Sequence, residues 1–269
     1  MGIPYAEVIG DPVAHSKSPL IHRYWLRRMK IVGDYKATRV GPGELSDYFA
    51  ARRADPDWRG CNVTMPYKQA VAGHLDMIDP VARRIGAVNT VINHSAELLM
   101  GTNTDFQGAH FALDGSGPAG KTVVLVGTGG AARAVMEELR QAGASEVTVL
   151  ARNEGKARDL LDRFGVEGAT GPIGGAPVAD LLINATPLGM EGRPTLDIDL
   201  SALGPGATVF DLVYHPLETR LLADARRLGL RTVDGLVMLI WQASMAFTYF
   251  FGEPPARPDS PELRELLVR

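Results

Sequence analysis

The stretch VVLVGTGGAARAV, residues 123–135, decides the fold of this chain. Its uninterrupted apolar run is typical of a buried parallel strand, and it leads directly into glycines and then a helical pattern. The spacing Gly127-x-Gly129-x-x-Ala132 predicts a phosphate-binding turn. The first glycine permits the tight turn, and the second lets the backbone approach a pyrophosphate at the positive end of the helix. A plain glycine turn is the alternative, because the motif alone is a weak signal.

The end of the next expected strand indicates which dinucleotide binds. NAD-binding proteins usually place Asp or Glu there to hold the ribose 2′-hydroxyl. This chain has Leu150-Ala151-Arg152-Asn153, followed by Lys156. Arg152 and Lys156 would bind a 2′-phosphate, which a carboxylate would repel. The pattern therefore favours NADP over NAD; two solvated cations at a helix start are the alternative.

Working outward, the chain shows two α/β segments separated by a Gly- and Pro-rich stretch at residues 114–120. Before it, short strands and helices alternate, with one helix expected from Lys68 and a hairpin that turns at Ser95-Ala96. After it, apolar runs predict parallel strands that end in polar loops. The later runs are DLLINATP (180–187), ATVFDLVYHP (207–216) and LRTVDG (230–235). The fold class is therefore α/β, in two units.

Composition excludes several classes of protein. The 269 residues carry a net charge of −3 with scattered arginines, so neither nucleic acid nor an anionic membrane is expected as a partner. The single cysteine, Cys61, excludes an intrachain disulfide and suits a reducing cytoplasm. The six histidines show no metal-binding spacing, so no metal is expected.

One segment has nearly the length and apolarity of a membrane span. Residues 235–252, GLVMLIWQASMAFTYFFG, carry no charge, but Gln242, Ser244 and Thr248 interrupt them. A buried helix of a globular protein is the better interpretation. The first residues, MGIPYAEV, lack a basic segment followed by an apolar run, so no secretory signal is expected.

A second constellation raises the question of chemistry. In GCNVTMPYK, Lys68 follows a proline and two small polar residues, Asn62 and Thr64. A hydride transfer to a carbonyl needs a proton donor, and a lysine ammonium can serve. Asp105, which is expected to open a helix, could position that lysine or simply cap the helix. Local sequence leaves both alternatives open for Asp105, and a surface role open for Lys68.

Together these motifs resemble the shikimate dehydrogenase family, and they cover nearly the whole chain in the family's order. They are HSKSP (15–19), NVTMPYK (62–68), GAVNT (86–90), NTD (103–105), GTGGAARA (127–134), NATPLGM (184–190), DLVYHPLET (211–219) and DGLVMLIWQA (234–243). The resemblance implies an α/β substrate-binding and catalytic domain at 1–104, completed by C-terminal helices at 238–269. It also implies a Rossmann-like NADP-binding domain at 105–237, and the reversible reduction of 3-dehydroshikimate to shikimate in aromatic amino-acid and chorismate biosynthesis.

Site residues follow by position from the resemblance. It implies that Lys68 and Asp105 are the catalytic acid–base pair. The implied ligands of the substrate's carboxylate and hydroxyls are Ser16, Ser18, Asn62, Thr64, Asn89, Tyr214 and Gln242. The implied cofactor-binding residues are Gly127, Gly129, Gly130, Ala131, Arg152, Lys156, Thr186, Val213 and Gly235.

The chain departs from the family pattern in places. Ala151 and Asn153 stand where Asn and Thr are common, and Val237 stands where Gly is usual. A quinate/shikimate dehydrogenase-like paralogue with another cofactor or substrate preference therefore stays an alternative, as does a non-catalytic NADP-sensing module. The expected partner is a small-molecule substrate, and the chain is expected to be a monomer or homodimer.

Overall fold

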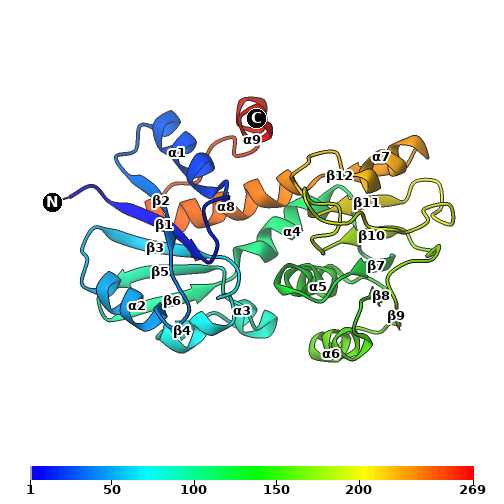
Figure 1. Ribbon diagram of the computed structural model, residues 1–269, viewed down its shortest axis with the longest axis horizontal. Coiled ribbons are helices and arrows are strands. Elements are labelled where there is room, and N and C mark those ends of the chain that lie inside the picture. Colours follow the sequence, from blue (N-terminus) through cyan, green and yellow to red (C-terminus); the bar gives the residue numbers. More distant parts are fainter. Residues whose placement is uncertain (1) are drawn as a thin grey trace. The chain divides into compact units, whose positions relative to one another are not determined.

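The computed structural model describes residues 2–269, which form two compact units. The first comprises the residues up to Thr104 together with Ile240–Leu267, and the second comprises Asp105–Leu239. Each unit has its own six-stranded sheet with helices packed against it (Figure 1). The α/β fold class expected from the sequence is confirmed.

The sheet of the first unit is mixed. Its strands lie in the order β2-β1-β3-β5-β6-β4, and β5 runs antiparallel to both β3 and β6. The expected hairpin is the β5–β6 pair, but β5 extends through Ser95, so the turn falls one residue later, at Ala96-Glu97. The strand bounds are β1 (Tyr5–Gly10), β2 (Asp34–Arg39), β3 (Trp58–Val63), β4 (Met77–Ile78), β5 (Thr90–Ser95) and β6 (Leu98–Thr102).

Helices cover both faces of this sheet, because residues of β1 alternate between two apolar layers. Ala6 and Val8 pack with Phe250 of α8, whereas Tyr5 and Ile9 pack in a layer with α2. Figure 1 shows α1 and α8 on one side of the sheet and α2 on the other. The helix bounds are α1 (Ser18–Met29), α2 (Leu45–Arg53), α3 (Pro80–Ile85), α8 (Gly235–Phe251) and α9 (Pro261–Val268).

The short helix expected from Lys68 is present, but the prediction of its start is wrong. It is a 3₁₀ helix, Ala70–His74, that begins two residues later, and Lys68 lies in the turn before it. The Lys68 carbonyl accepts a hydrogen bond from the Val88 N–H at 2.7 Å, outside any helical ladder. This bond holds the lysine's backbone beside the segment that leads into β5.

The apolar segment after Gly235 forms α8, and its inward residues Ala246, Phe247 and Phe250 are buried. The expectation of a buried helix is confirmed for them. Among residues 2–269, no helix combines the length and the apolarity that crossing a bilayer requires.

The sheet of the second unit is fully parallel, in the order β12-β11-β10-β7-β8-β9, as the apolar runs predicted. Figure 1 shows α5 and α6 on one face and α7 on the other. The strand order reverses between β7 and β10, and ligands of such sheets bind at the carboxyl ends beside that reversal. The bounds are α4 (Thr104–Asp114), β7 (Thr122–Val126), α5 (Gly130–Ala142), β8 (Glu146–Leu150), α6 (Glu154–Phe164), β9 (Thr170–Gly171), β10 (Leu181–Asn184), β11 (Thr208–Asp211), α7 (Arg220–Arg227) and β12 (Arg231–Val233).

Gly60 is the position where the first unit's packing demands glycine most strictly. Its φ is +143°, and an added Cβ would lie 2.2 Å from the Val91 carbonyl oxygen and 2.8 Å from Cε1 of Phe250. Neither the strand carbonyl nor the packed ring has room to withdraw, so strand β3 passes beneath α8 only without a side chain here.

We predict that Gly60→Ala lowers the free energy of unfolding by about 1–3 kcal/mol, the usual range for overpacking a core. Thermal and urea unfolding followed by circular dichroism would measure it. Gly73→Ala is the matched control in the same unit, because nothing lies within 4 Å of its added Cβ. Equal unfolding midpoints for the two variants would contradict the packing argument.

Candidate active site

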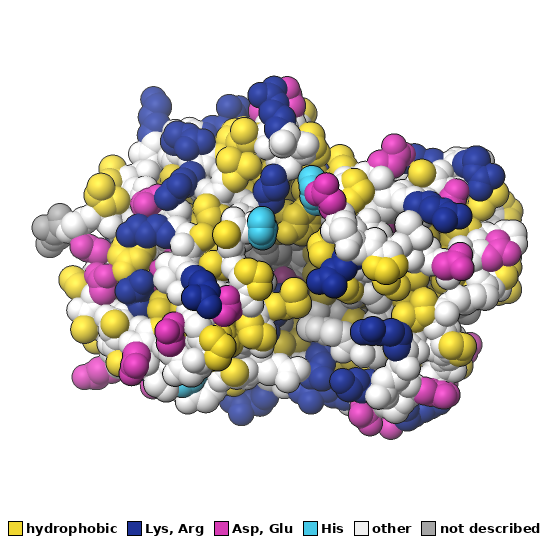
Figure 2. All heavy atoms as spheres, in the orientation of Figure 1, with side chains coloured by type: hydrophobic (Ala, Val, Ile, Leu, Met, Phe, Trp, Pro, Cys, Tyr) yellow, Lys and Arg dark blue, Asp and Glu magenta, His cyan; other side chains and the backbone are white. Residues whose placement is uncertain are grey.

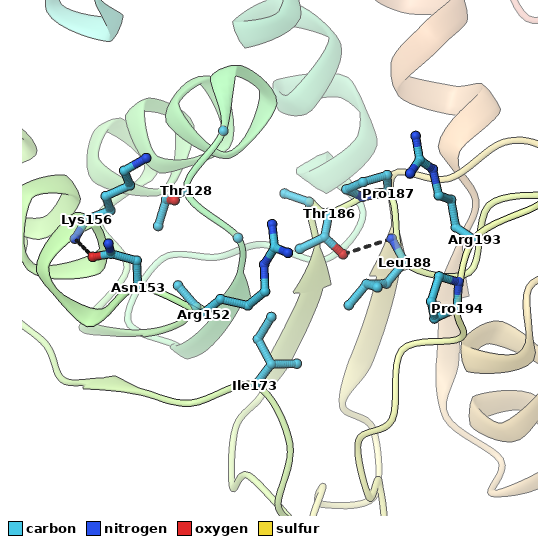
Figure 3. Close-up of a pocket in the computed structure, with 14 residues that line it drawn as sticks. Thr128, Arg152, Asn153, Lys156, Ile173, Thr186, Pro187, Leu188, Arg193 and Pro194 are labelled. Atoms are coloured by element: carbon cyan, nitrogen blue, oxygen red, sulfur yellow. Dashed lines mark hydrogen bonds between the residues drawn. The ribbon is translucent and has the colours of Figure 1, made fainter.

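A cleft of about 700 Å³ opens in the second unit at the carboxyl ends of β7, β8 and β10. Its walls are the turns that follow these strands and the loop Pro187–Pro194 (Figure 3). Five of the residues expected to bind a cofactor line it. They are Gly127, Gly129, Arg152, Lys156 and Thr186. The topology therefore brings together residues that lie up to 59 positions apart in the sequence, from 127 to 186.

The two motif glycines have different physical roles here. Gly127 has a φ of +111°, and its Cβ would lie 2.9 Å from Cγ2 of Thr186, so the turn closes tightly against the loop after β10. Gly129 precedes α5 without a side-chain cap, and its Cβ would meet nothing within 4 Å. The space beside the first backbone amides of α5 is therefore open, and no side chain caps those amides. A pyrophosphate fits there.

Three cations line the cleft, namely Arg152, Lys156 and Arg193. None of the described residues that line it is Asp or Glu. In Figure 3 the guanidinium of Arg152 extends into the space between Thr128 and Thr186. A cleft with cations and no carboxylate fits a dinucleotide that carries an extra 2′-phosphate.

Asn153, one of the departures from the family pattern, has a structural role in this wall. Its Oδ1 accepts the Lys156 N–H at 3.0 Å and so caps the start of α6. This cap fixes the backbone turn from which both Arg152 and Lys156 project. The substitution therefore preserves the support of the two cations.

A buried pair at the ends of β10 and β11 holds the loop on the other side of the cleft. Nδ2 of Asn184 donates to Oδ1 of Asp211 at 2.9 Å and to the Leu188 carbonyl at 3.0 Å. The Thr186 hydroxyl donates to Oδ1 of Asn184 at 2.7 Å. It also accepts the Leu188 N–H at 3.1 Å (Figure 3). Burial raises the pKa of the Asp211 carboxyl, and the Thr219 hydroxyl bond opposes this. The turn NATPLG is thus held by hydrogen bonds among its own residues and by the bond from Asn184 to Asp211.

Four other residues expected to bind the cofactor do not line this cleft. Gly130 and Ala131 open α5, Val213 follows β11, and Gly235 opens α8. Gly235 has a packing reason to be glycine, because its Cβ would lie 2.4 Å from the Leu212 carbonyl oxygen. Cofactor contact by these four residues stays a prediction.

The first unit contains a hydrogen-bonded group that we call the polar cluster: Tyr35, Asn62, Asn89, Thr90, Thr104 and Gln242. All are buried except Gln242, which is half-buried. At one end, Asn62 accepts from the Tyr35 hydroxyl through Oδ1 at 2.5 Å. Its Nδ2 donates to the Thr90 hydroxyl at 2.9 Å and to the Asn89 carbonyl at 3.3 Å. Asn62 is thus held at both ends of its amide.

The other end of the polar cluster joins two further predicted ligand positions, Asn89 and Gln242, to the start of α4. Oδ1 of Asn89 accepts the Thr104 N–H at 2.7 Å, and its Nδ2 donates to the Thr104 hydroxyl at 3.1 Å. The Thr104 hydroxyl donates to Oε1 of Gln242 at 3.4 Å. Asn62, Asn89 and Gln242, far apart in the chain, are therefore brought together.

The remaining ligand positions of the first unit lie at the ends of β1 and β3. Oγ of Ser16 accepts the N–H of Ser18, the first residue of α1, at 3.3 Å. Thr64 follows β3, and its N–H donates to the Ile9 carbonyl at 2.9 Å, so the strand pairing continues one residue past the strand. Lys68 is half-buried in the next turn. Their contacts with a substrate stay predictions.

Asp105 and Tyr214 belong to the second unit. Asp105 is the second residue of α4 and is buried, so it lies inside the helix rather than at the capping position before it. Tyr214 lies in the loop after β11, where burial raises its pKa. The catalytic role of the first and the ligand role of the second stay predictions.

Sequence reasoning missed Tyr35, Thr90 and Thr104 of the polar cluster, and Arg193 of the cleft. A signal for the two threonines was present, because each follows an asparagine in a quoted motif, Asn89-Thr90 and Asn103-Thr104. Tyr35 and Arg193 stand in no motif. Among residues 2–269, no group of three or more His, Cys, Asp or Glu side chains is placed to hold a metal ion.

Comparison with known proteins now bears on this geometry. Residues 8–91 match the model of the shikimate dehydrogenase substrate binding domain, and residues 113–174 match that of shikimate / quinate 5-dehydrogenase. The chain is 50% identical to the shikimate dehydrogenase (NADP(+)) of Sphingopyxis alaskensis over 98% of its own length and 97% of the relative's. This chain belongs to the shikimate dehydrogenase family.

Solved structures of this and related activities share the architecture. The shikimate 5-dehydrogenase of Thermus thermophilus, in complex with NADP(H) and shikimate, is 36% identical with a TM-score of 0.86, covering 99% of both chains. A ligand-free 5-ketofructose reductase of Gluconobacter sp. is 31% identical with a TM-score of 0.91, covering 99% of this chain and 98% of the other. Members of this fold therefore differ in the ketone they act on.

We predict that Arg152→Ala weakens NADPH binding to this shikimate dehydrogenase family member about tenfold, because a charge-assisted contact with the 2′-phosphate is lost. NADH, which lacks that phosphate, should bind almost as before. Quenching of protein fluorescence during titration with each cofactor would measure both dissociation constants.

The control for this variant is Arg158→Ala. Arg158 is exposed on α6 in the same unit but does not line the cleft, so the control removes the same charge elsewhere. It should leave both dissociation constants nearly unchanged. Equal weakening of NADPH and NADH by Arg152→Ala would show that Arg152 does not read the 2′-phosphate.

Proposed function

We propose that this protein catalyses the reversible, NADP-dependent reduction of 3-dehydroshikimate to shikimate. The observation that carries the proposal is the 50% identity, over almost the full length of both chains, to a shikimate dehydrogenase (NADP(+)). The two sites described above support it independently. One is rich in short polar groups, and the other has cations and a glycine turn.

The polar cluster supports the proposed substrate class. Shikimate carries one carboxylate and three hydroxyls on a small ring, so it needs many short hydrogen-bonding groups and little apolar wall. Asn62, Asn89 and Gln242 supply amides from three different elements, and their neighbours in the polar cluster hold them in place. Ser16 and Ser18 would bind the carboxylate, and Thr64 and Tyr214 would contribute further hydroxyls.

The cleft of the second unit supports the proposed cofactor. Bound there, NADPH would supply the hydride that reduces the carbonyl. The open start of α5 above Gly129 would receive the pyrophosphate, and Arg152 with Lys156 the 2′-phosphate. Gly127 and Thr186 close the turn beneath it. Arg193 adds a third cation on the opposite wall.

Lys68 and Asp105 are the proposed acid–base pair. In the direction of reduction, the oxygen of the former carbonyl gains negative charge and takes a proton from the Lys68 ammonium. In the direction of oxidation, the lysine receives that proton back. The Asp105 carboxylate, in the first turn of α4, would hold the ammonium in the correct orientation.

The proposed reaction belongs to the biosynthesis of chorismate and the aromatic amino acids, and we place it in the cytoplasm. The free thiol of Cys61 is buried, which suits a reducing compartment but does not require one. Figure 2 shows Lys and Arg side chains scattered among neutral and acidic ones on the face in view, which supports a small-molecule partner rather than nucleic acid. A monomer or homodimer is proposed.

Two other functions are compared in one assay. The similarity to a 5-ketofructose reductase favours, as a second candidate, reduction of another polyhydroxylated ketone. A quinate-oxidising relative is a variant of this candidate, and the Corynebacterium glutamicum quinate dehydrogenase, in complex with NAD, is 31% identical with a TM-score of 0.87. A non-catalytic NADP sensor would show no turnover at all.

We predict that the purified protein oxidises NADPH when it is given 3-dehydroshikimate, and oxidises NADH much more slowly. Absorbance at the reduced-nicotinamide band follows both reactions, with 5-ketofructose as a parallel substrate and quinate tested with NADP⁺ and NAD⁺. If 5-ketofructose or quinate is turned over faster than 3-dehydroshikimate, that compound would be the substrate in place of the one proposed. No turnover of any pair would support the sensor.

Replacing Lys68 by Ala should lower kcat about 10²–10⁴-fold, the usual contribution of a proton donor, with little change in the KM for substrate. Steady-state kinetics in both directions would measure this. Lys36→Ala is the control, because it removes an ammonium that stacks on Tyr5 in the same unit, 3.9 Å from the ring centre. A Lys68→Ala variant with wild-type kcat would exclude the lysine as proton donor.

A further inference from the structure

The hydrogen bonds of the polar cluster from Tyr35 through Asn62 to Thr90 run in one direction. Nδ2 of Asn62 faces the Asn89 carbonyl, which can only accept, so this amide cannot be reversed. Its Oδ1 therefore faces the Tyr35 hydroxyl, and Tyr35 must be the donor. The backbone carbonyl of Asn89 therefore determines which groups donate and which accept at this end of the polar cluster.

The same reasoning fixes the side-chain amide of Asn89. Oδ1 of Asn89 faces the Thr104 N–H, which can only donate. The Thr90 hydroxyl, which accepts from Asn62, has two acceptors within reach, Oδ1 of Asn89 at 3.0 Å and the Thr104 hydroxyl at 3.1 Å. A series of donors thus leads from Tyr35 through Asn62 to Thr90 and on to Asn89 or Thr104, and such chains strengthen each of their bonds. Tyr35 is the first donor in it.

Tyr35 is placed to hold this position rigidly. It is fully buried on β2, and its ring stacks on the imidazole of His22 with centroids 3.9 Å apart and planes 7° apart. Burial lowers the pKa of His22 to about 3, so the stacked ring stays neutral at physiological pH. Burial also raises the pKa of the Tyr35 phenol well above its ordinary value. The phenol therefore keeps its proton.

The Tyr35 hydroxyl thus holds one of the expected substrate ligands, Asn62. Both protons of the Asn62 amide are used within the protein, and its Oδ1 keeps one lone pair beyond the bond from Tyr35. Asn62 can therefore accept from a substrate hydroxyl but cannot donate to a carboxylate.

We propose that Tyr35 is a positioning residue of the substrate site, whose hydroxyl fixes Asn62 so that Asn62 meets the substrate as a hydrogen-bond acceptor for a ring hydroxyl. This rests on the proposed function, and it assigns a role to a residue outside every recognised motif. Without the phenol hydroxyl, the buried Oδ1 of Asn62 loses its donor, and the amide shifts to find another.

Tyr35→Phe tests this, because it keeps the ring and its stack on His22 and removes only the hydroxyl. We expect the KM for shikimate, and its dissociation constant measured by calorimetry in the presence of NADP⁺, to rise about tenfold. The KM for NADP⁺ should stay within about twofold, because the cofactor cleft lies in the other unit.

Tyr48→Phe is the matched control. Tyr48 is a buried tyrosine of the same unit whose hydroxyl donates to Glu7 Oε1 at 2.7 Å, and it packs in the apolar layer with Tyr5 and Ile9 rather than with Tyr35. It should lower the melting temperature and leave the KM for shikimate unchanged. A merely structural role for Tyr35 would make the two variants alike.

The outcomes separate this inference from the proposed function. A Tyr35→Phe enzyme with the wild-type KM and dissociation constant for shikimate overturns the positioning role, while wild-type turnover of shikimate leaves the function intact. A wild-type protein that neither oxidises nor binds shikimate overturns both. A selective rise in KM for shikimate, absent from Tyr48→Phe, supports the positioning role.

Discussion

The structure of the first unit depends on the requirement that buried amides be satisfied at both ends. Asn89 is 3% exposed, and its backbone carbonyl accepts from the Val63 N–H at 2.7 Å as well as from Asn62. Its side chain accepts the N–H of Thr104, the first residue of α4. A single asparagine thus joins the end of β3 to the start of the helix that carries Asp105. Removing the side-chain amide of Asn62 or Asn89 would leave a buried partner without its hydrogen bond. This would lower the free energy of unfolding by about 1–3 kcal/mol. Fold and expected substrate site therefore share the same bonds.

In the second unit, buried polar groups at the carboxyl ends of the parallel sheet are likewise hydrogen-bonded to one another. There the Asn184–Asp211 pair is buried between two strand ends, and it holds the loop that closes over Gly127. The buried carboxylate is surrounded by donors, among them the Thr219 hydroxyl at 2.6 Å and the Val213 N–H at 3.0 Å. Cations stand only at the open wall, where solvent and a phosphate can reach them. Polar groups that shape this cleft are thus buried and mutually satisfied, whereas those expected to bind the ligand are exposed.

The sequence predicted the parts of the molecule that local patterns specify. Apolar runs ending in polar loops identified the parallel strands of the second unit, and the glycine spacing identified the turn before α5. The predicted cofactor residues Arg152 and Lys156 follow from their place after β8, and both line the cleft. Long-range partners were beyond such reasoning. Tyr35 reaches Asn62 only because β1 pairs with both β2 and β3, and Arg193 reaches the cleft only because the turn after Asn184 folds back. Lys68 was expected to open a helix, but its carbonyl accepts the N–H of Val88, a long-range partner that the local pattern does not specify.

The central claim is that the polar cluster is a preformed site for a cyclic polyhydroxy acid. Crystal structures determined with NADP⁺ alone and with NADP⁺ and shikimate would test it most directly. The account predicts a ring hydroxyl of shikimate on Oδ1 of Asn62, with the bonds of Asn62 to Tyr35, Thr90 and Asn89 unchanged within about 0.5 Å between the two structures. Shikimate bound without contact to Asn62, or an Asn62 amide that rotates to meet it, would contradict the claim.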